Sequence, residues 1–170
     1  MIDRARLALT LESSEHTAAL GAWVAPRLGV GDVLLLSGPI GAGKTHFARA
    51  LIQARQAAHG VAEDVPSPSF TLVQTYVAGG LEIWHVDLYR LCDPSEAWEL
   101  GLDDALATAL CLIEWPERLG AAAPGDALHL TFCPDARDTA RRLILTGGAV
   151  RWHTLLGDMA EAFASAVTND

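Results

Sequence analysis

The chain has 170 residues, of which 51% are hydrophobic and 19% charged, and its net charge is −9. This length and composition are typical of one globular domain, so we predict a single domain over residues 1–170 and exclude a largely disordered chain. The acidic balance argues against a protein that holds bare nucleic acid through its overall field. Three cysteines without C-x-x-C spacing argue against a zinc site or redox pair. Since no stretch reaches the length of a membrane span, we expect a soluble, cytoplasmic protein without a membrane partner.

Hydrophobic periodicity and turn residues divide the chain into strands and helices. In chain order they are a strand over 7–11, a helix capped by Ser13 or Ser14 that runs to about residue 28, a strand over 33–37, a helix over 44–58, strands over 70–77 and 81–87, helices over 94–100 and 103–109, strands over 109–114, 128–132 and 142–145, and a helix over 152–166. Pro26 should bend or end the first helix early. The Gly79-Gly80 pair predicts a hairpin between its flanking strands.

One strand-to-helix connection, over residues 38–45, reads G-x-x-x-x-G-K-T. Glycines at these positions let the backbone direct successive N–H groups toward one point, where the helix dipole adds positive potential. Lys44 would reach the β- and γ-phosphates of a nucleotide, and the Thr45 hydroxyl would hold Mg²⁺. The nucleotide-binding residues predicted here are Gly38, Gly41, Ala42, Gly43, Lys44, Thr45 and His46. The elements and this loop together predict a three-layer α/β fold of the P-loop NTPase type, with a mixed sheet that is parallel around the loop and antiparallel at the hairpin.

Two carboxylates end predicted strands and are candidates for the same site. Glu114 ends an apolar strand, which is where nucleotide hydrolases of this architecture place the residue that holds Mg²⁺. Asp87 ends another strand and could orient the attacking water. The alternatives are a solvated strand end for Glu114 and a turn or capping role for Asp87. We predict Lys44, Asp87 and Glu114 as the catalytic set, with ATP as the nucleotide and Thr45 and Glu114 as the Mg²⁺ ligands.

Four motifs in this order resemble one bacterial family. They are G-x-x-G-A-G-K-T, then S-P-S-F-T-L-V from residue 67, H-V-D-L-Y-R-L from residue 85, and I-E-W-P from residue 113. Their order and spacing are similar to those of the TsaE (YjeE) family, small P-loop ATPases that support synthesis of N6-threonylcarbamoyladenosine at position 37 of tRNAs reading ANN codons. The resemblance runs from about residue 13 to 145.

The resemblance implies roles for individual residues. It implies that Thr45 and Glu114 hold Mg²⁺, that Asp87 is needed for ATP hydrolysis, and that Trp115 is a functional position. It also implies that Thr17 lies close to the nucleotide, together with an arginine that is either Arg141 or Arg142; Arg142 is placed in the binding set. The S-P-S-F segment would be a switch-like loop. The expected partners are the TsaB and TsaD subunits, with tRNA reached indirectly through that complex.

Two positions depart from the family pattern. Pro39-Ile40 replaces an acidic residue that usually follows the first glycine, and Ser69 replaces a threonine but keeps the hydroxyl.

Three other residues near the motifs have expected roles. Tyr89 and Trp84 are expected to pack in the core. Arg90 is expected either to pair with Asp87 or to meet a phosphate.

Other functions remain as alternatives to the ATPase. A small-molecule kinase shares the loop, but such enzymes usually need an arginine-rich lid, and only Arg137, Arg141 and Arg142 are clustered. A GTP switch would need D-x-x-G and N/T-K-x-D motifs, which are missing. A nucleotide-binding scaffold without turnover is the remaining alternative.

Overall fold

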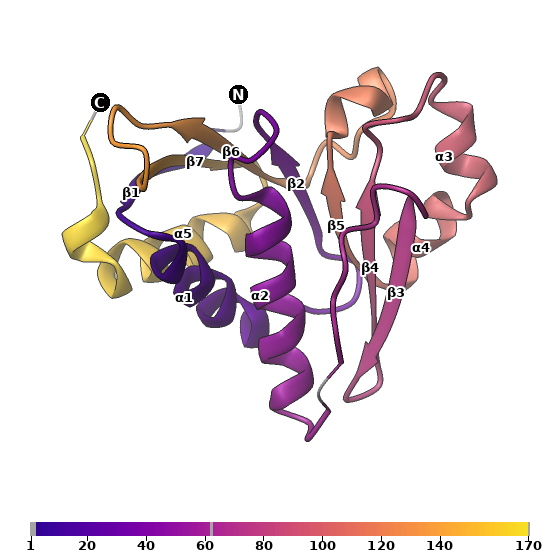
Figure 1. Ribbon diagram of the computed structural model, residues 1–170, viewed down its shortest axis with the longest axis horizontal. Helices are drawn as coiled ribbons and strands as arrows, with labels where there is room; N and C mark the ends of the chain where they lie inside the picture. Colours follow the sequence, from indigo (N-terminus) through magenta and orange to yellow (C-terminus); the bar gives the residue numbers. More distant parts are fainter. Residues whose placement is uncertain (1–2, 62, 170) are drawn as a thin grey trace.

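One seven-stranded sheet organises the molecule (Figure 1). The computed structural model describes residues 3–61 and 63–169. The strands are β1 (Ala5–Leu11), β2 (Val33–Ser37), β3 (Val73–Ala78), β4 (Leu81–Asp87), β5 (Leu110–Glu114), β6 (Leu128–Pro134) and β7 (Arg141–Gly147), and their order across the sheet is β1-β7-β6-β2-β5-β4-β3. Because all of them join one sheet, we infer that these residues fold as one domain.

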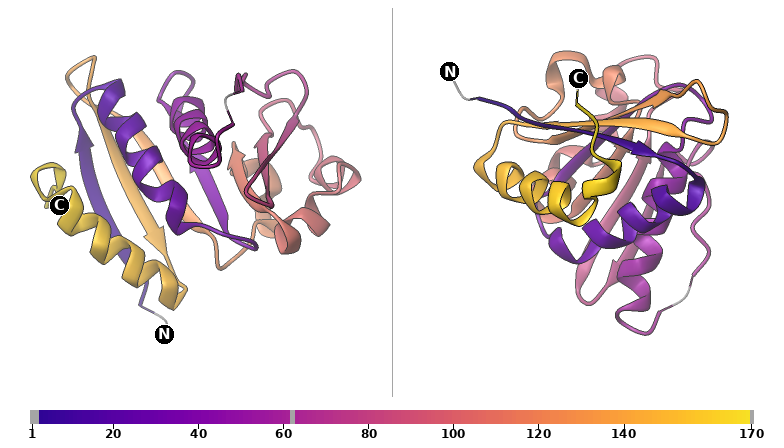
Figure 2. Two further views of the ribbon diagram at one scale, coloured as in Figure 1. Left: turned by 90° about the horizontal axis from the view of Figure 1, so that it is seen from below. Right: turned by 90° about the vertical axis from the view of Figure 1, so that its left-hand side faces the viewer.

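The helices cover the sheet on both faces and make the three-layer arrangement. They are α1 (Ser14–Val24), α2 (Lys44–Ala57), α3 (Ser95–Glu99), α4 (Leu102–Thr108) and α5 (Val150–Ala162), with short 3₁₀ segments at Ala25–Arg27, Pro116–Ala122 and Ala164–Ala166. Figures 1 and 2 show α1, α2 and α5 along the same face. Alternate side chains of the central strand β2 pack against the helices on opposite faces of the sheet. Leu34 and Leu36 pack with α1, α2 and α5, whereas Leu35 packs with α3 and α4. The expected three-layer α/β fold is confirmed.

The sheet is mixed, as expected. β2 pairs in parallel with β5 and β6, and β5 pairs in parallel with β4, whereas β3 and β4 form the predicted antiparallel hairpin. The other edge, β6-β7-β1, is also antiparallel, which the sequence did not predict. The parallel centre brings the ends of β2, β4 and β5 to one edge, where Glu114 lies opposite Leu36 on one side and Asp87 on the other.

Several element boundaries differ from the sequence-based expectation, most clearly at the start of β3 and at the end of the last helix. The strand predicted from Phe70 begins only at Val73, because the Leu72 N–H donates to the Pro68 carbonyl in a turn and Leu72 has a left-handed φ of 65°. The last helix leaves α-helical geometry at Phe163. Other signals are confirmed: Ser13 caps α1 by accepting the His16 N–H, and α1 ends two residues before Pro26. Within the described residues, no helix is both long enough and apolar enough to cross a membrane.

The glycine-rich connection between β2 and α2 requires glycine at its first position. Gly38 has a φ of +142°, and a Cβ atom there would lie 2.5 Å from the Phe132 carbonyl oxygen of the neighbouring strand β6. Gly41 also has a positive φ, +77°, but a Cβ atom there would meet no atom within 4 Å. Glycine is therefore required at position 38 for two reasons, the positive φ and the close approach of the β6 backbone.

We expect Gly38→Ala to destabilise the fold more than Gly41→Ala. The left-handed backbone alone should cost about 1–2 kcal/mol in each variant. The contact with Phe132 should add about 1–3 kcal/mol for Gly38→Ala only. Urea denaturation of both variants measures the two free energies of unfolding, and equal losses would contradict the proposed clash.

Candidate functional site

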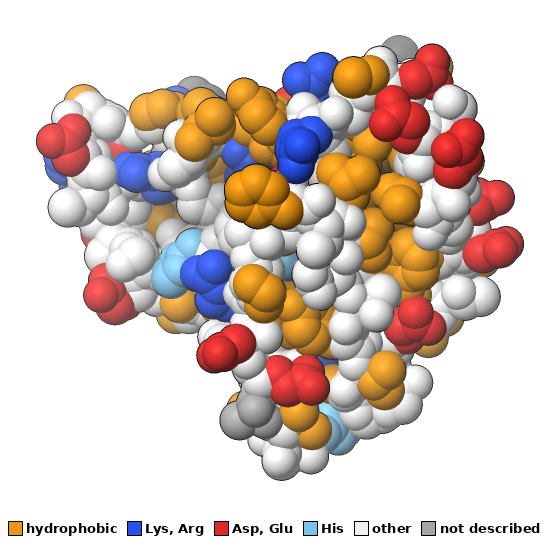
Figure 3. Space-filling model, turned by 45° about the vertical axis from the view of Figure 1, so that its right-hand side comes forward, with side chains coloured by type: hydrophobic (Ala, Val, Ile, Leu, Met, Phe, Trp, Pro, Cys, Tyr) orange, Lys and Arg blue, Asp and Glu red, His pale blue; other side chains and the backbone are white. Residues whose placement is uncertain are grey.

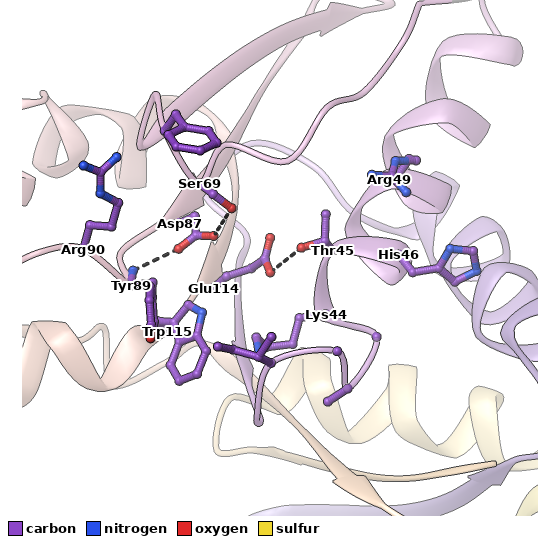
Figure 4. Close-up of a pocket in the computed structure, with 15 residues that line it drawn as sticks. Lys44, Thr45, His46, Arg49, Ser69, Asp87, Tyr89, Arg90, Glu114 and Trp115 are labelled. Carbon is purple, nitrogen blue, oxygen red and sulfur yellow. Dashed lines mark hydrogen bonds between the residues drawn. The ribbon is translucent and has the colours of Figure 1, made fainter. Parts of the chain in front are cut away.

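A cavity of about 700 Å³ opens at the edge where β2, β4 and β5 end (Figure 4). Its wall contains the glycine-rich loop, the start of α2, the ends of β4 and β5 and the segment before β3. The lining residues are Ile40, Gly41, Ala42, Gly43, Lys44, Thr45, His46, Arg49, Ser69, Phe70, Asp87, Tyr89, Arg90, Glu114 and Trp115. Most residues predicted for the site therefore come together in one cavity, while Gly38, Thr17 and Arg142 are not among those that line it.

Glu114 is buried inside the site, only 2% exposed, so its alternative as a solvated strand end is wrong. Its Oε1 accepts a hydrogen bond from the Thr45 hydroxyl at 2.7 Å, and its Oε2 lies 2.7 Å from Nε2 of His85. A carboxylate and a hydroxyl supply the hard oxygen ligands that Mg²⁺ prefers. Among the described residues, no group of three or more His, Cys, Asp or Glu side chains is placed to hold a metal ion. Thr45 and Glu114 are therefore the residues of this cavity that could hold a magnesium ion.

Lys44 is also buried, and its ammonium group lies within the loop itself. Nζ donates to the carbonyl oxygens of Gly38 and Pro39 and lies 4.2 Å from the centroid of the Trp115 ring. Desolvation lowers the pKa of Lys44 from its ordinary value, an effect that the nearby carboxylates, Glu114 first, oppose. A desolvated cation with weak carbonyl partners interacts strongly with an anion that enters the cavity.

Asp87 is 5% exposed at the end of β4 and divides its oxygens between two partners. Oδ1 accepts the Tyr89 N–H at 2.9 Å, which is the turn role considered for this residue. Oδ2 accepts the Ser69 hydroxyl at 3.3 Å and faces the cavity from the side opposite the glycine-rich loop (Figure 4). The turn therefore fixes one oxygen, and the other is shared with the S-P-S-F segment.

An aromatic wall closes the cavity beside Lys44. Trp115 has a left-handed φ of 59° and its ring contacts that of Tyr89 in a tilted arrangement, with 4.9 Å between the ring centroids and 51° between the ring planes. Tyr89 is 45% exposed, so the expectation that it packs in the core is wrong, because the chain turns out of the sheet after Asp87. Trp84, inside β4, does pack against the core formed with α3 and α4.

Two further residues line this wall. Arg90 was expected either to pair with Asp87 or to meet a phosphate, and its guanidinium lies 5.7 Å from the ring centroid of Phe70, which is 87% exposed. Phe70 was not named as a site residue, although it belongs to the S-P-S-F segment that the family resemblance marks as a switch-like loop.

The remaining predicted residues lie around the loop. Thr17 is buried on α1. Its methyl group lies 4.0 Å from the point that a Cβ atom would occupy if Gly43 carried a side chain. His46 lines the cavity, but its Nε2 also lies 2.8 Å from the Ser14 carbonyl oxygen and so connects α2 to α1.

Of the two candidate arginines, Arg141 contacts the loop. Its Nη2 donates to the Gly41 carbonyl at 3.4 Å. Arg142 is the next residue of β7, where side chains alternate between the faces of the sheet. This alternation favours Arg141 as the arginine near the nucleotide, whereas Arg142 was the one predicted to bind it.

Comparison with known proteins identifies the family. The profile of the family described as "Threonylcarbamoyl adenosine biosynthesis protein TsaE" matches residues 11–143. Two proteins named tRNA threonylcarbamoyladenosine biosynthesis protein TsaE are similar to the chain: that of Rickettsia conorii is 45% identical over 64% of this chain and 60% of its own length, and that of Bacillus subtilis is 33% identical over 86% and 89%.

A solved structure agrees with these sequence matches. The crystal structure of Bacillus subtilis YdiB superposes with a TM-score of 0.77 at 27% identity, covering 94% of this chain and 97% of that one. The chain belongs to the TsaE family of tRNA threonylcarbamoyladenosine biosynthesis proteins.

Proposed function

We propose that the protein is a Mg²⁺-dependent ATPase that serves as an auxiliary subunit in threonylcarbamoyladenosine modification of position 37 in tRNAs reading ANN codons. The observation that carries this proposal is the hydrogen bond between Thr45 and Glu114, which lies beside a buried lysine at the start of α2. The relatives named for this biosynthesis support the pathway. They do not favour the small-molecule kinase considered from the sequence.

The glycine-rich loop binds the phosphates in this proposal. Residues of the loop and of the first turn of α2 line the cavity, where their backbone N–H groups would donate to phosphate oxygens, and Lys44 would exchange its carbonyl partners for phosphate oxygens. Thr45 and Glu114 hold Mg²⁺, which neutralises charge on the phosphates when it is bound. The side chain of Thr17 supports the loop at Gly43, and Arg141 supports it at Gly41.

Asp87 orients the water that attacks the γ-phosphate. Its Oδ1 is fixed by the Tyr89 N–H, which leaves Oδ2 to accept a proton from that water when Ser69 moves away. Ser69 and Phe70 belong to the same short loop, and the Phe70 side chain, which is 87% exposed, does not anchor that loop in the core. Nucleotide binding and loop position are therefore coupled through the Asp87 carboxylate.

We propose TsaB and TsaD as the partners of this ATPase and place tRNA contact mainly on them. Acidic side chains gather over α3 and α4, along the right-hand flank in Figure 3, and would repel tRNA phosphates. The acidic residues of these two helices and their approach are Asp93, Glu96, Glu99, Asp103 and Asp104. Because the pathway modifies tRNA, we also propose that the protein acts in the cytoplasm.

ATP hydrolysis should be slow for the isolated chain and should accelerate when TsaB and TsaD are added. The reason is that the loop carrying Ser69 and Phe70 would be ordered by the partner rather than by this chain alone. Phosphate release measured with and without both partners tests this. Fast hydrolysis by the isolated chain, at a rate that TsaB and TsaD do not change, would contradict the auxiliary role.

Asp87→Asn should preserve ATP binding and slow hydrolysis by about 10²- to 10⁴-fold, because the amide keeps the turn but is a poor proton acceptor. Asp104→Asn, on the exposed side of α4, is the matched control and should behave like the parent. Binding by calorimetry and single-turnover hydrolysis separate the two effects. Hydrolysis by Asp87→Asn at the parent rate would leave Asp87 with the turn role alone.

ATP affinity should fall with rising pH in a range below that in which an ordinary lysine loses its proton. Burial lowers the pKa of Lys44, so its ammonium loses the proton at a lower pH than an ordinary lysine, and only the charged form attracts phosphate. Lys44→Ala should bind about 10- to 100-fold more weakly at neutral pH, with no further loss over this range. An equally steep pH dependence in Lys44→Ala would assign the titration to another group.

A further inference from the structure

His85 is the most deeply buried titratable side chain that contacts the site without lining it. It lies on β4 with 0% of its surface exposed, two residues before Asp87 and therefore on the same face of the strand. Its Cα pairs with Leu112, two residues before Glu114 on β5. The parallel register thus places the His85 ring next to the Glu114 carboxylate, and His85 is not among the residues that line the cavity.

The contacts of the ring define which nitrogen carries the hydrogen. Nε2 lies 2.7 Å from Glu114 Oε2, while Nδ1 is buried and has no hydrogen-bond partner among the described residues. A buried N–H without an acceptor is more costly than a buried lone pair without a donor. The hydrogen therefore belongs on Nε2, which donates it to Glu114, and Nδ1 carries the lone pair.

This donor gives the two oxygens of Glu114 different partners. Oε2 accepts the hydrogen bond from Nε2 of His85, and Oε1 accepts the hydrogen bond from the Thr45 hydroxyl at the start of α2. With Oε2 fixed, the carboxylate cannot rotate to present both oxygens to the cavity. A hydrogen bond from a second residue is the usual means by which proteins orient a metal-ligating carboxylate.

We propose that His85 is a positioning residue that holds the Glu114 carboxylate so that Oε1 is presented to Mg²⁺ together with the Thr45 hydroxyl. The inference rests on the proposed function, since it assigns a role in magnesium binding at the same site. His85 does not line the cavity and touches neither nucleotide nor metal in this role. Its effect is on metal affinity and not on the ATP contacts made by the glycine-rich loop.

Two variants separate positioning from packing. His85→Gln carries an N–H donor at about the distance of Nε2, whereas His85→Asn is one methylene shorter and cannot reach Glu114. Both are polar and similar in size, so their effects on folding should be comparable. Urea denaturation of both provides that control.

The first measurement is the gain in ATP affinity on adding Mg²⁺, obtained by calorimetry with and without the metal. We expect His85→Gln to keep the gain of the parent and His85→Asn to lose about 10- to 100-fold of it, with equal affinities for metal-free ATP. If His85→Asn keeps the full gain, the inference is overturned and the proposed function stands. If the parent itself shows no gain, the proposed function fails, and the inference with it.

The second measurement needs neither activity nor a variant of His85. Long-range ¹⁵N–¹H correlation spectra of the unmodified protein without nucleotide should show His85 with hydrogen on Nε2 and a bare Nδ1. Glu114→Gln should shift the Nε2–H resonance, because it changes the acceptor. Hydrogen on Nδ1, or a resonance that ignores Glu114→Gln, would overturn the inference even if both His85 variants unfold.

Discussion

The parallel register of β2, β5 and β4 is the constraint on which the site depends. It aligns the last residues of three strands, so that Leu36 lies opposite Glu114 and Glu114 opposite Asp87. The glycine-rich loop that follows β2 and the two carboxylates therefore meet at one edge, although 69 residues separate Thr45 from Glu114. Ligands bind at this edge in open α/β sheets because the loops there diverge and leave a crevice.

Burial of charge is the second physical feature of the site. Lys44, Asp87 and Glu114 are each at most 5% exposed, and each has partners that compensate for lost hydration. Carbonyl oxygens and the Trp115 ring surround the ammonium, and Thr45 and His85 contact Glu114. Because these partners are in place before any ligand arrives, a bound nucleotide would meet groups that are already oriented and only weakly screened by water.

The sequence predicted those parts of the molecule that depend on local signals. The glycine-rich loop, β2, α2, the hairpin and the cap at Ser13 follow from neighbouring residues, and the structure places them as expected. Glu114 and Asp87 were found because each ends an apolar strand. The features that local patterns did not predict depend on contacts between distant segments. They are the antiparallel edge β6-β7-β1, the contact between the rings of Tyr89 and Trp115, and the bond from His85 to Glu114. Arg141 and Arg142 are adjacent, and only the register of β7 distinguishes which one meets the loop.

A structure of the protein with Mg²⁺ and a non-hydrolysable ATP analogue is the most direct test of the central claim. The triphosphate should lie against the backbone of residues 41–45, with Lys44 moved from the loop carbonyls to the phosphates. The metal should lie between the Thr45 hydroxyl and Oε1 of Glu114. A nucleotide bound elsewhere, or a metal ion that Glu114 does not contact, would contradict it.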